Sequence, residues 1–451
     1  MQRRQFMAVS GAMAAGTLAA RGAAARAADG LDDGYFLSPR NPVATRDQRE
    51  LEARALQLLA RPDVQRAKAA ARRSFETVTS NAASAETLGL LPAFAESYAF
   101  RSIQLAVNSD ANYPRVLRVY SPAGRWLGND VPESRWGKEN PDNAYRIIPV
   151  AAGGRYVIRG RRAANPPTDV SYVLTGDANT STTLQLIGQK AIPVAPDGSF
   201  EITLDDGPAN GRPNHFQLTP DALYLFIRDT MGDWQQTPNT LRVERLNPPT
   251  RAPLTMDELA ARAALIMQTG VAPSYFWCRS TLNVPVQTLR TPELTGAMGG
   301  LPTQLSSSGW VRLADDEAAI VTVDPLAAGY RSITLYDMWG RTLDYRDRLT
   351  SYNTAAMAAD ADDRFSFVLA RTDPGVHNWL DTMGLHELEV GFRWQGITAK
   401  IERTPRLLTQ VVKVETLGSA LPPGIRRITE PERARQLRER QSLFDRRFID
   451  S

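Results

Sequence analysis

The spacing of apolar residues changes along the chain, and this change separates a helical beginning from a β-rich remainder. From residue 47 to residue 75, leucines recur at helical spacing among Ala, Glu and Arg, which predicts an amphipathic helix interrupted near Pro62. After about Ala144, apolar residues come in short runs bounded by Gly, Pro, Asn and Asp, a pattern typical of strands. The strands expected in this first β-rich run are 145–150, 155–161, 170–175, 200–204 and 223–227.

A helix is expected between this run and a second one. Three prolines between residues 248 and 253 end the strand pattern, and residues 256–268 then carry acidic residues in a first turn and apolar residues on one face. Further strands are expected at 310–313, 319–323, 331–339, 364–369 and 386–394. We therefore predict a mainly β protein with two antiparallel β-sandwich or jelly-roll-like regions, a helical N-terminal segment and a bridging helix.

These patterns divide the chain into six predicted segments. A length of 451 residues favours more than one domain, because a single hydrophobic core stops growing at roughly 250 to 300 residues. The predicted segments are a signal peptide (1–27), a helical N-terminal segment and lead-in (28–140), a first β-rich region (141–250), a bridging helix (251–272), a second β-rich region (273–420) and a charged C-terminal tail expected to be helical (421–451).

The first residues predict export. Arg3 and Arg4 precede a weakly apolar Ala/Gly run, which resembles a twin-arginine signal, and residues 25–27 form an A-x-A cleavage site before Ala28. The apolar run is shorter than the roughly 20 residues that span a bilayer. We therefore expect a periplasmic protein without a transmembrane segment in its mature chain. The single cysteine, Cys278, excludes an internal disulfide, and its aromatic neighbours are typical of a buried thiol.

Composition excludes several partners and cofactors. The 53 basic and 49 acidic residues are interspersed, so no basic stretch could follow the phosphate backbone of a nucleic acid. No Gly-x-Gly-x-x-Gly, Walker loop or Gly-x-Ser-x-Gly elbow occurs, so we predict no cofactor and no α/β-hydrolase triad. The three histidines, His215, His377 and His386, lack ligand spacing, and we predict no metal site.

Several short motifs resemble the bacterial family built on domain of unknown function 1214, whose members often carry domain of unknown function 1254 as well. The resemblance covers residues 141–395 and implies a β-sandwich or jelly-roll architecture, but no reaction and no catalytic residues. Its motifs are Asn140–Tyr145, Tyr156–Gly160, Asp197–Glu201, Leu241–Arg245, Asp373–Gly375, Asn378–Thr382 and Arg393–Trp394.

The segment from residue 373 to residue 394 is the strongest candidate for a site, because it gathers acids, two imidazoles and an aromatic side chain in one loop. Asp381 and His386 could form a proton-transfer pair beside Arg393, and these three are the predicted catalytic residues. The predicted ligand-binding residues are His377, Asn378, Trp379, Arg159 and Tyr145. The structural alternative is that the Asp and Asn side chains cap turns, Trp379 fills a core and His386 is a satisfied core residue.

Arg155, Arg159 and Arg161 would share one face of a strand. They could clamp an anionic ligand, since guanidinium groups match carboxylates and sulfates. They could equally form a solvated face that pairs with acidic residues of a neighbouring strand.

Three functions fit these features. The first, which we favour, is an exported enzyme acting on a small organic molecule without a redox cofactor, as a hydrolase, lyase or isomerase. The second is a non-catalytic periplasmic binding module for a lipid-like, terpenoid or carbohydrate ligand. The third is an envelope protein that works through protein contacts alone. A pocket with two titratable groups of opposed pKa shifts would favour the enzyme.

Overall fold

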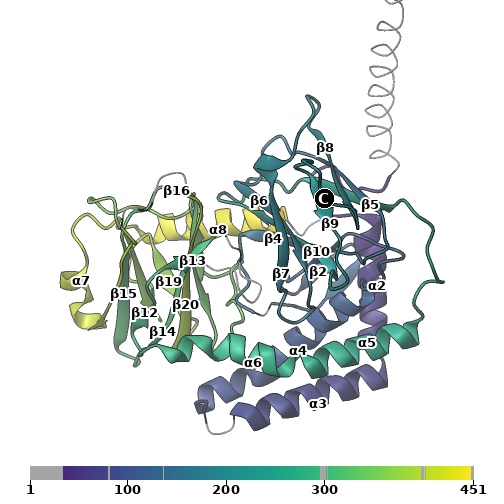
Figure 1. Cartoon of the computed structure of the whole chain (residues 1–451). Helices are drawn as coiled ribbons and strands as arrows, with labels where there is room; N and C mark the ends of the chain where they lie inside the picture. Colours follow the sequence, from purple (N-terminus) through teal and green to yellow (C-terminus); the bar gives the residue numbers. More distant parts are fainter. Residues whose placement is uncertain are drawn as a thin grey trace, which may run out of the picture.

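The computed structural model describes residues 34–79, 82–135, 137–294, 301, 303–397, 401 and 403–447, and it consists of two β-sandwiches connected by helices (Figure 1). Both sandwiches are mainly antiparallel, so the predicted fold class is confirmed. No helix among the described residues combines the length and the apolar character needed to cross a membrane.

Five helices pack into a layer beneath the first sandwich (Figure 1). They are α2 (Arg46–Leu59), α3 (Pro62–Thr79), α4 (Ala85–Val107), α5 (Met256–Thr269) and α6 (Val271–Arg279). Polar caps fix where these helices begin: the side chain of Thr45 accepts from the Gln48 amide, and Thr255 forms a capping box with Glu258. The expected interruption at Pro62 is the start of α3, because proline is tolerated in the first turn of a helix.

The first sandwich has a five-stranded and a four-stranded sheet. The five-stranded sheet has the order β1 (Leu117–Val119), β4 (Asn143–Pro149), β10 (Tyr224–Thr230), β6 (Asp169–Thr175) and β7 (Thr183–Gly188). The four-stranded sheet has the order β11 (Thr240–Arg245), β5 (Tyr156–Arg161), β8 (Ser199–Asp205) and β9 (His215–Gln217). The first β-rich region thus begins before residue 141, because β1 pairs with β4 across its full length.

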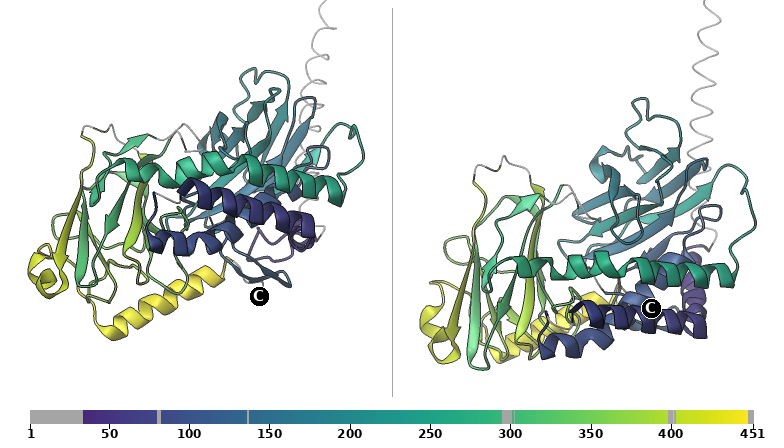
Figure 2. Two further views of the ribbon diagram at one scale, coloured as in Figure 1. Left: turned by 90° about the horizontal axis from the view of Figure 1, so that it is seen from below. Right: turned by 60° about the horizontal axis from the view of Figure 1, so that its bottom comes forward.

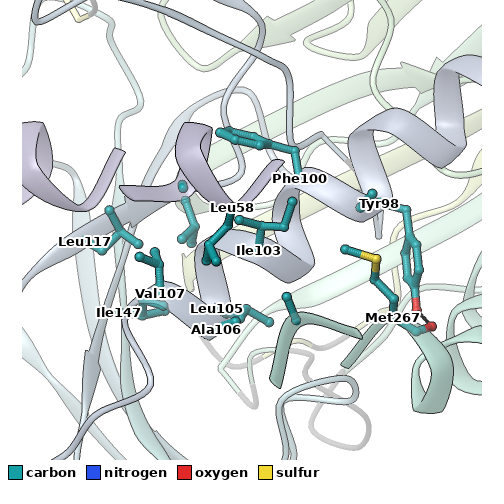
Figure 3. Packing of buried hydrophobic residues seen from close by; sticks show 14 of the residues in the cluster. Leu58, Tyr98, Phe100, Ile103, Leu105, Ala106, Val107, Leu117, Ile147 and Met267 are labelled. Atoms are coloured by element: carbon teal, nitrogen blue, oxygen red, sulfur yellow. Dashed lines mark hydrogen bonds between the residues drawn. The ribbon is translucent and has the colours of Figure 1, made fainter. Parts of the chain in front are cut away.

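The outer face of the five-stranded sheet packs against the helices. Figure 3 shows Ile103 and Leu58 from the helices in the same apolar cluster as Leu117 and Ile147 from the sheet. Within the helical layer, the hydroxyl of Tyr98 donates to the backbone oxygen of Met267 at 2.6 Å, which ties α4 to α5 (Figure 3). The helix expected as a bridge is therefore part of a layer, and α6 continues from it toward the second sandwich (Figure 2).

The second sandwich also has two sheets. The larger has the order β12 (Thr288–Leu289), β14 (Leu305–Arg312), β20 (Glu387–Ile397), β16 (Ala328–Tyr336) and β17 (Ser351–Asn353), with β13 (Glu293–Leu294) paired to β14. The smaller has the order β19 (Trp379–Asp381), β18 (Phe365–Ala370), β15 (Glu317–Val323) and β21 (Leu407–Lys413). A two-stranded ribbon of β2 (Gly124–Trp126) and β3 (Asn129–Val131) precedes β4.

The last helix, α8 (Glu430–Asp445), lies along both sandwiches (Figure 2). Buried arginines at heptad spacing reach from this helix and its end into the body of the protein. Arg433 pairs with Asp373 at 2.8 Å, and Arg440 donates to the backbone oxygen of Tyr345 at 2.7 Å. Arg447, two residues past the helix, donates to the backbone oxygen of Pro141 at 2.7 Å in the first sandwich. The tail therefore contacts both sandwiches.

Candidate functional site

A cavity of about 510 Å³ lies between the two sandwiches and is bordered by α4 and α6. Its size is within the range of pockets that bind small organic molecules. Tyr145 on β4 and Arg228 on β10 come from the first sandwich, whereas Tyr336 on β16 and Arg393 on β20 come from the second. Trp277 on α6 contributes an aromatic wall. The cavity thus depends on both sandwiches being in place.

The central strand β20 provides the floor because its two faces have opposite character. Its even-numbered residues from Leu388 to Trp394 point into the apolar core of the second sandwich and are fully buried. Glu389, Gly391 and Arg393, which alternate with these residues, line the cavity, as the period of two in a strand requires.

Gly391 leaves room for a ligand atom beside two polar groups. A Cβ atom at this position would lie 3.1 Å from Cε2 of Tyr336, 3.7 Å from its hydroxyl oxygen and 3.8 Å from Nη1 of Arg393. Among the described residues, neither the Tyr336 hydroxyl nor Arg393 Nη1 makes a hydrogen bond of good geometry, although both atoms are buried. The two side chains lie close enough to interact only weakly with each other. Buried polar groups are rarely left unpaired in folded proteins, and ligand-binding sites are one place where this happens.

Two tyrosines of the cavity, Tyr336 and Tyr145, are buried. Burial raises the pKa of Tyr336 above its usual value, and the positive charge of Arg393 only partly opposes this. Burial also raises the pKa of Tyr145, against the charges of Arg393 and Arg228. Both hydroxyls therefore keep their protons at neutral pH. Five cationic side chains and three carboxyl groups line the cavity, which favours an anionic occupant.

The segment from residue 137 to residue 143 forms one side of the cavity. Lys138 forms an ion pair with Glu389 at 2.7 Å, and its backbone oxygen accepts from Nη2 of Arg393 at 2.7 Å. The Asn140 amide donates to the hydroxyl of Tyr145 at 2.9 Å. Between them, the carboxyl group of Glu139 accepts from the hydroxyl of Thr342. Burial raises the pKa of Glu139 to about 7.

Of the predicted catalytic residues, the structure places only Arg393 in the cavity. His386 is 44% exposed and contacts Glu86 at 2.9 Å and Asp315 at 3.1 Å. Asp381 instead pairs with Arg348 at 3.3 Å. The predicted Asp381–His386 pair is therefore wrong. The physical reason is that Asp381 ends β19 in the smaller sheet, whereas His386 precedes β20 in the larger one.

Tyr145 is the only predicted ligand-binding residue that lines the cavity. His377, Asn378 and Trp379 hold the β18–β19 connection together: the side chain of each donates a hydrogen bond to a backbone oxygen of residues 356, 358, 366 or 370. These side chains therefore stabilise the loop, which is the structural alternative to a ligand-binding role. Arg159 forms ion pairs with Glu201 at 3.0 Å and Glu244 at 2.5 Å on the neighbouring strands, so this member of the predicted arginine face is paired within its sheet.

Sequence reasoning missed Lys138, Glu139, Tyr336 and Glu389. A sequence pattern could have indicated Glu389, because charged residues alternate with apolar ones in a strand that is buried on both faces. Lys138 and Glu139 lie in a connection whose position no periodicity reveals. The cavity holds no cluster of metal-ligand type either: within the described residues, no group of three or more His, Cys, Asp or Glu side chains could hold a metal ion.

Comparison with known proteins finds similar structures but no described activity. No family model matches the sequence, and no curated protein resembles it. A crystal structure of an uncharacterized protein from Burkholderia cenocepacia is 27% identical and covers 81% of this chain and 100% of its own, with a TM-score of 0.66. The VPA0106 protein from Vibrio parahaemolyticus is 12% identical over 71% of this chain and 98% of its own, with a TM-score of 0.40. The similarity to the Burkholderia protein supports the two-sandwich fold, and the resemblance to the family of domain 1214 stays a prediction.

Proposed function

We propose that the protein binds a small organic molecule through an anionic group, such as a carboxylate, in the cavity between the sandwiches. The observation that carries this proposal is the pair of buried, unpartnered atoms at Gly391: the hydroxyl of Tyr336 and Nη1 of Arg393. The oxygen atoms of an acid bound beside Gly391 would accept from both groups. Hydrogen bonds to a charged acceptor are about twice as strong as neutral ones.

The charge of the cavity supports an acidic ligand over the apolar ones considered for a binding module. A purely lipid-like or terpenoid ligand would leave Arg393 and Tyr336 unpaired in a buried place, which is unfavourable by roughly 1 to 3 kcal/mol for each group. Aromatic side chains such as Trp277 and Phe226 still provide apolar contact area. A small organic acid with an apolar part could bind the polar groups and the aromatic side chains at the same time.

Binding can be tested with a panel of small organic acids, each compared with its neutral amide. We expect acids to raise the melting temperature of the protein and to give a heat of binding in calorimetry, whereas the amides should not. Arg393→Gln should abolish both signals, and Tyr336→Phe should weaken binding about tenfold, or about 1.4 kcal/mol. Arg403→Gln is the matched control, because Arg403 is 71% exposed and pairs with Asp324 outside the cavity. Equal binding of acids and amides would contradict the proposal.

We also propose that the protein works in the periplasm. The proposal rests on the twin-arginine pattern of residues 1–27, which lie outside the described residues. A periplasmic location would give the protein access to organic acids that have crossed the outer membrane.

A further inference from the structure

Glu139 has one carboxyl oxygen in use and one free. Its Oε1 accepts from the Thr342 hydroxyl, whereas its Oε2 is buried and has no hydrogen-bond partner among the described residues. The whole residue is 4% exposed and lines the cavity. A buried carboxyl oxygen without a donor is unfavourable for folding, so its position calls for an explanation.

The surroundings of Glu139 bring it to the same side of the cavity as the anion-binding pair. Thr342, which holds Oε1, pairs through its backbone with Tyr336. The neighbouring residue, Lys138, accepts from Arg393 through its backbone oxygen. The carboxyl group is also near enough to the hydroxyls of Tyr336 and Tyr145 for its charge to raise the pKa of both.

Glu389, a second carboxyl group of the cavity, is less suited to proton transfer. Glu389 is engaged on both sides: Lys138 pairs with Oε1 at 2.7 Å, and the Thr281 hydroxyl donates to Oε2 at 2.9 Å. Among the described residues, no cation donates a hydrogen bond to Glu139, although the charge of Arg135 acts on it. A group that exchanges protons at neutral pH works best with a pKa near the working pH, and burial raises the pKa of Glu139 to about 7.

We propose that Glu139 is the general base and acid for keto–enol isomerisation of a bound 2-oxo acid. This inference rests on the proposed anion binding and adds a reaction to it. The substrate class follows from the donors: the guanidinium of Arg393 pairs with the carboxylate, and the hydroxyl of Tyr336 donates to the adjacent carbonyl oxygen.

The step balances without any further reactant. Oε2 of Glu139 takes a proton from C3 of the 2-oxo acid, so the C3–H bond breaks and an O–H bond forms. The released electron pair forms the C2–C3 double bond, and the carbonyl π electrons move to the C2 oxygen. Tyr336 stabilises the resulting enolate oxygen through its hydrogen bond. Return of the proton from Glu139 to C3 restores the ketone, and return to the oxygen gives the enol.

The test is solvent deuterium exchange followed by proton NMR, with 2-oxobutanoate and phenylpyruvate as probes. The purified protein in D2O should accelerate the loss of the C3 proton signals above the uncatalysed rate. Glu139→Gln should keep binding, measured by calorimetry, and lower the exchange rate by about 100-fold or more. Asp315→Asn is the control variant, because Asp315 is 81% exposed and lies outside the cavity. The compound 3,3-dimethyl-2-oxobutanoate lacks C3 protons and reports binding alone.

The outcomes separate this inference from the binding proposal. If 2-oxo acids bind without accelerated exchange, the isomerisation is wrong and anion binding stands. If other organic acids bind and 2-oxo acids do not, the substrate class is wrong. Exchange that persists in Glu139→Gln would remove Glu139 as the base. If that variant does not fold, Glu139→Asp replaces it, and we expect slower exchange with binding retained. If no organic acid binds the wild-type protein, both proposals fail.

Discussion

Gly391 shows how a missing side chain can define a site. The residue lies in the middle of a fully paired strand, where glycine is normally unfavourable, since it contributes no packing. Its partners across the sheet are Ser308 and Thr334, which are also small. The space above Gly391 is therefore open to the polar groups of Tyr336 and Arg393.

A substitution at this glycine should block binding without unfolding the protein. In Gly391→Ala the new methyl group would occupy the position expected for an acid oxygen, and the Tyr336 ring would have to move by a few tenths of an ångström. We expect the affinity for organic acids to fall about tenfold or more, measured by calorimetry. Gly418→Ala is the matched control, because a Cβ there meets no atom within 4 Å. Unchanged affinity in Gly391→Ala would place the ligand elsewhere.

The contacts of His386 predict a contribution to pH-dependent stability. Hydrogen bonds to Glu86 and Asp315 raise the pKa of His386 above its usual 6.5. A histidine whose pKa is raised by folding stabilises the protein fully below about pH 6.5 and loses this contribution as the pH rises through the folded-state value. The hydrogen bonds between His386 and Glu86 connect the start of β20 to the start of α4.

The pH profile of the melting temperature tests this role. Between about pH 6 and pH 8, the melting temperature of the wild-type protein should fall relative to that of His386→Gln, which has no group to titrate there. Because the His386 side chain is 44% exposed, solvent screens its ion pairs and the difference should be small. Binding of organic acids should be equal in the two proteins, since His386 lies outside the cavity. A His386→Gln variant that folds normally and loses binding would reverse this assignment.

Among the elements, β20 carries both the core of the second sandwich and the floor of the cavity. Its alternating residues explain why the sequence predicted part of the strand correctly. The apolar positions from Leu388 to Trp394 are recognisable in any sequence, and their burial is confirmed. The function of the opposite face depends on the first sandwich, which covers it. Lys138 and Arg393 are 255 positions apart, and no periodicity predicts their contact.

The core face of β20 can be tested by Trp394→Ala. Trp394 is completely buried and packs on Phe392 with ring centroids 4.4 Å apart. Removing the indole should lower the free energy of unfolding by roughly 3 to 5 kcal/mol, measured by denaturant titration. A loss below about 1 kcal/mol would mean that the strand packs differently.

The arginines of α8 give this helix its own contribution to stability. Arg440 is buried and donates to the backbone oxygens of Tyr345 and Ser351, at 2.7 Å and 3.0 Å, and to the Ser351 hydroxyl. Arg440→Met should destabilise the protein by roughly 1 to 3 kcal/mol for each acceptor left unpaired. The exposed Arg438→Met on the same helix is the control and should change stability by less than about 0.5 kcal/mol. Similar losses in both variants would contradict the structural role of Arg440.

For the molecule as a whole, the fold class was more predictable than the site. Local sequence patterns define helices and strands, and they were sufficient to predict two β-rich regions and the burial of Cys278. The candidate loop from residue 373 to residue 394 was chosen for its polar composition. In the structure, its Asn378 and Trp379 satisfy backbone groups and its Asp381 pairs with an arginine. Polar residues in a loop were thus a poor guide, because turns need the same residue types as sites do.

The predicted export of the protein can be tested through its paired arginines. Replacing Arg3 and Arg4 together by Lys should keep the protein in the cytoplasm with its signal uncleaved, because the translocation machinery recognises the paired guanidinium groups. Immunoblots of cell fractions would show this, and N-terminal sequencing of the wild-type protein should begin near Ala28. Normal periplasmic accumulation of the double variant would refute the predicted route.

The shared walls of the cavity have a thermodynamic consequence. An acid held by Arg393 and Tyr336 of one sandwich while it contacts Tyr145 and Phe226 of the other would behave as a noncovalent crosslink. Opening of either sandwich would release it, so the ligand adds its binding free energy to the stability of both units at once. Without ligand, calorimetric melting could proceed in two steps, one for each sandwich. Saturation with an acid should merge these steps into one transition, in which the two sandwiches unfold together.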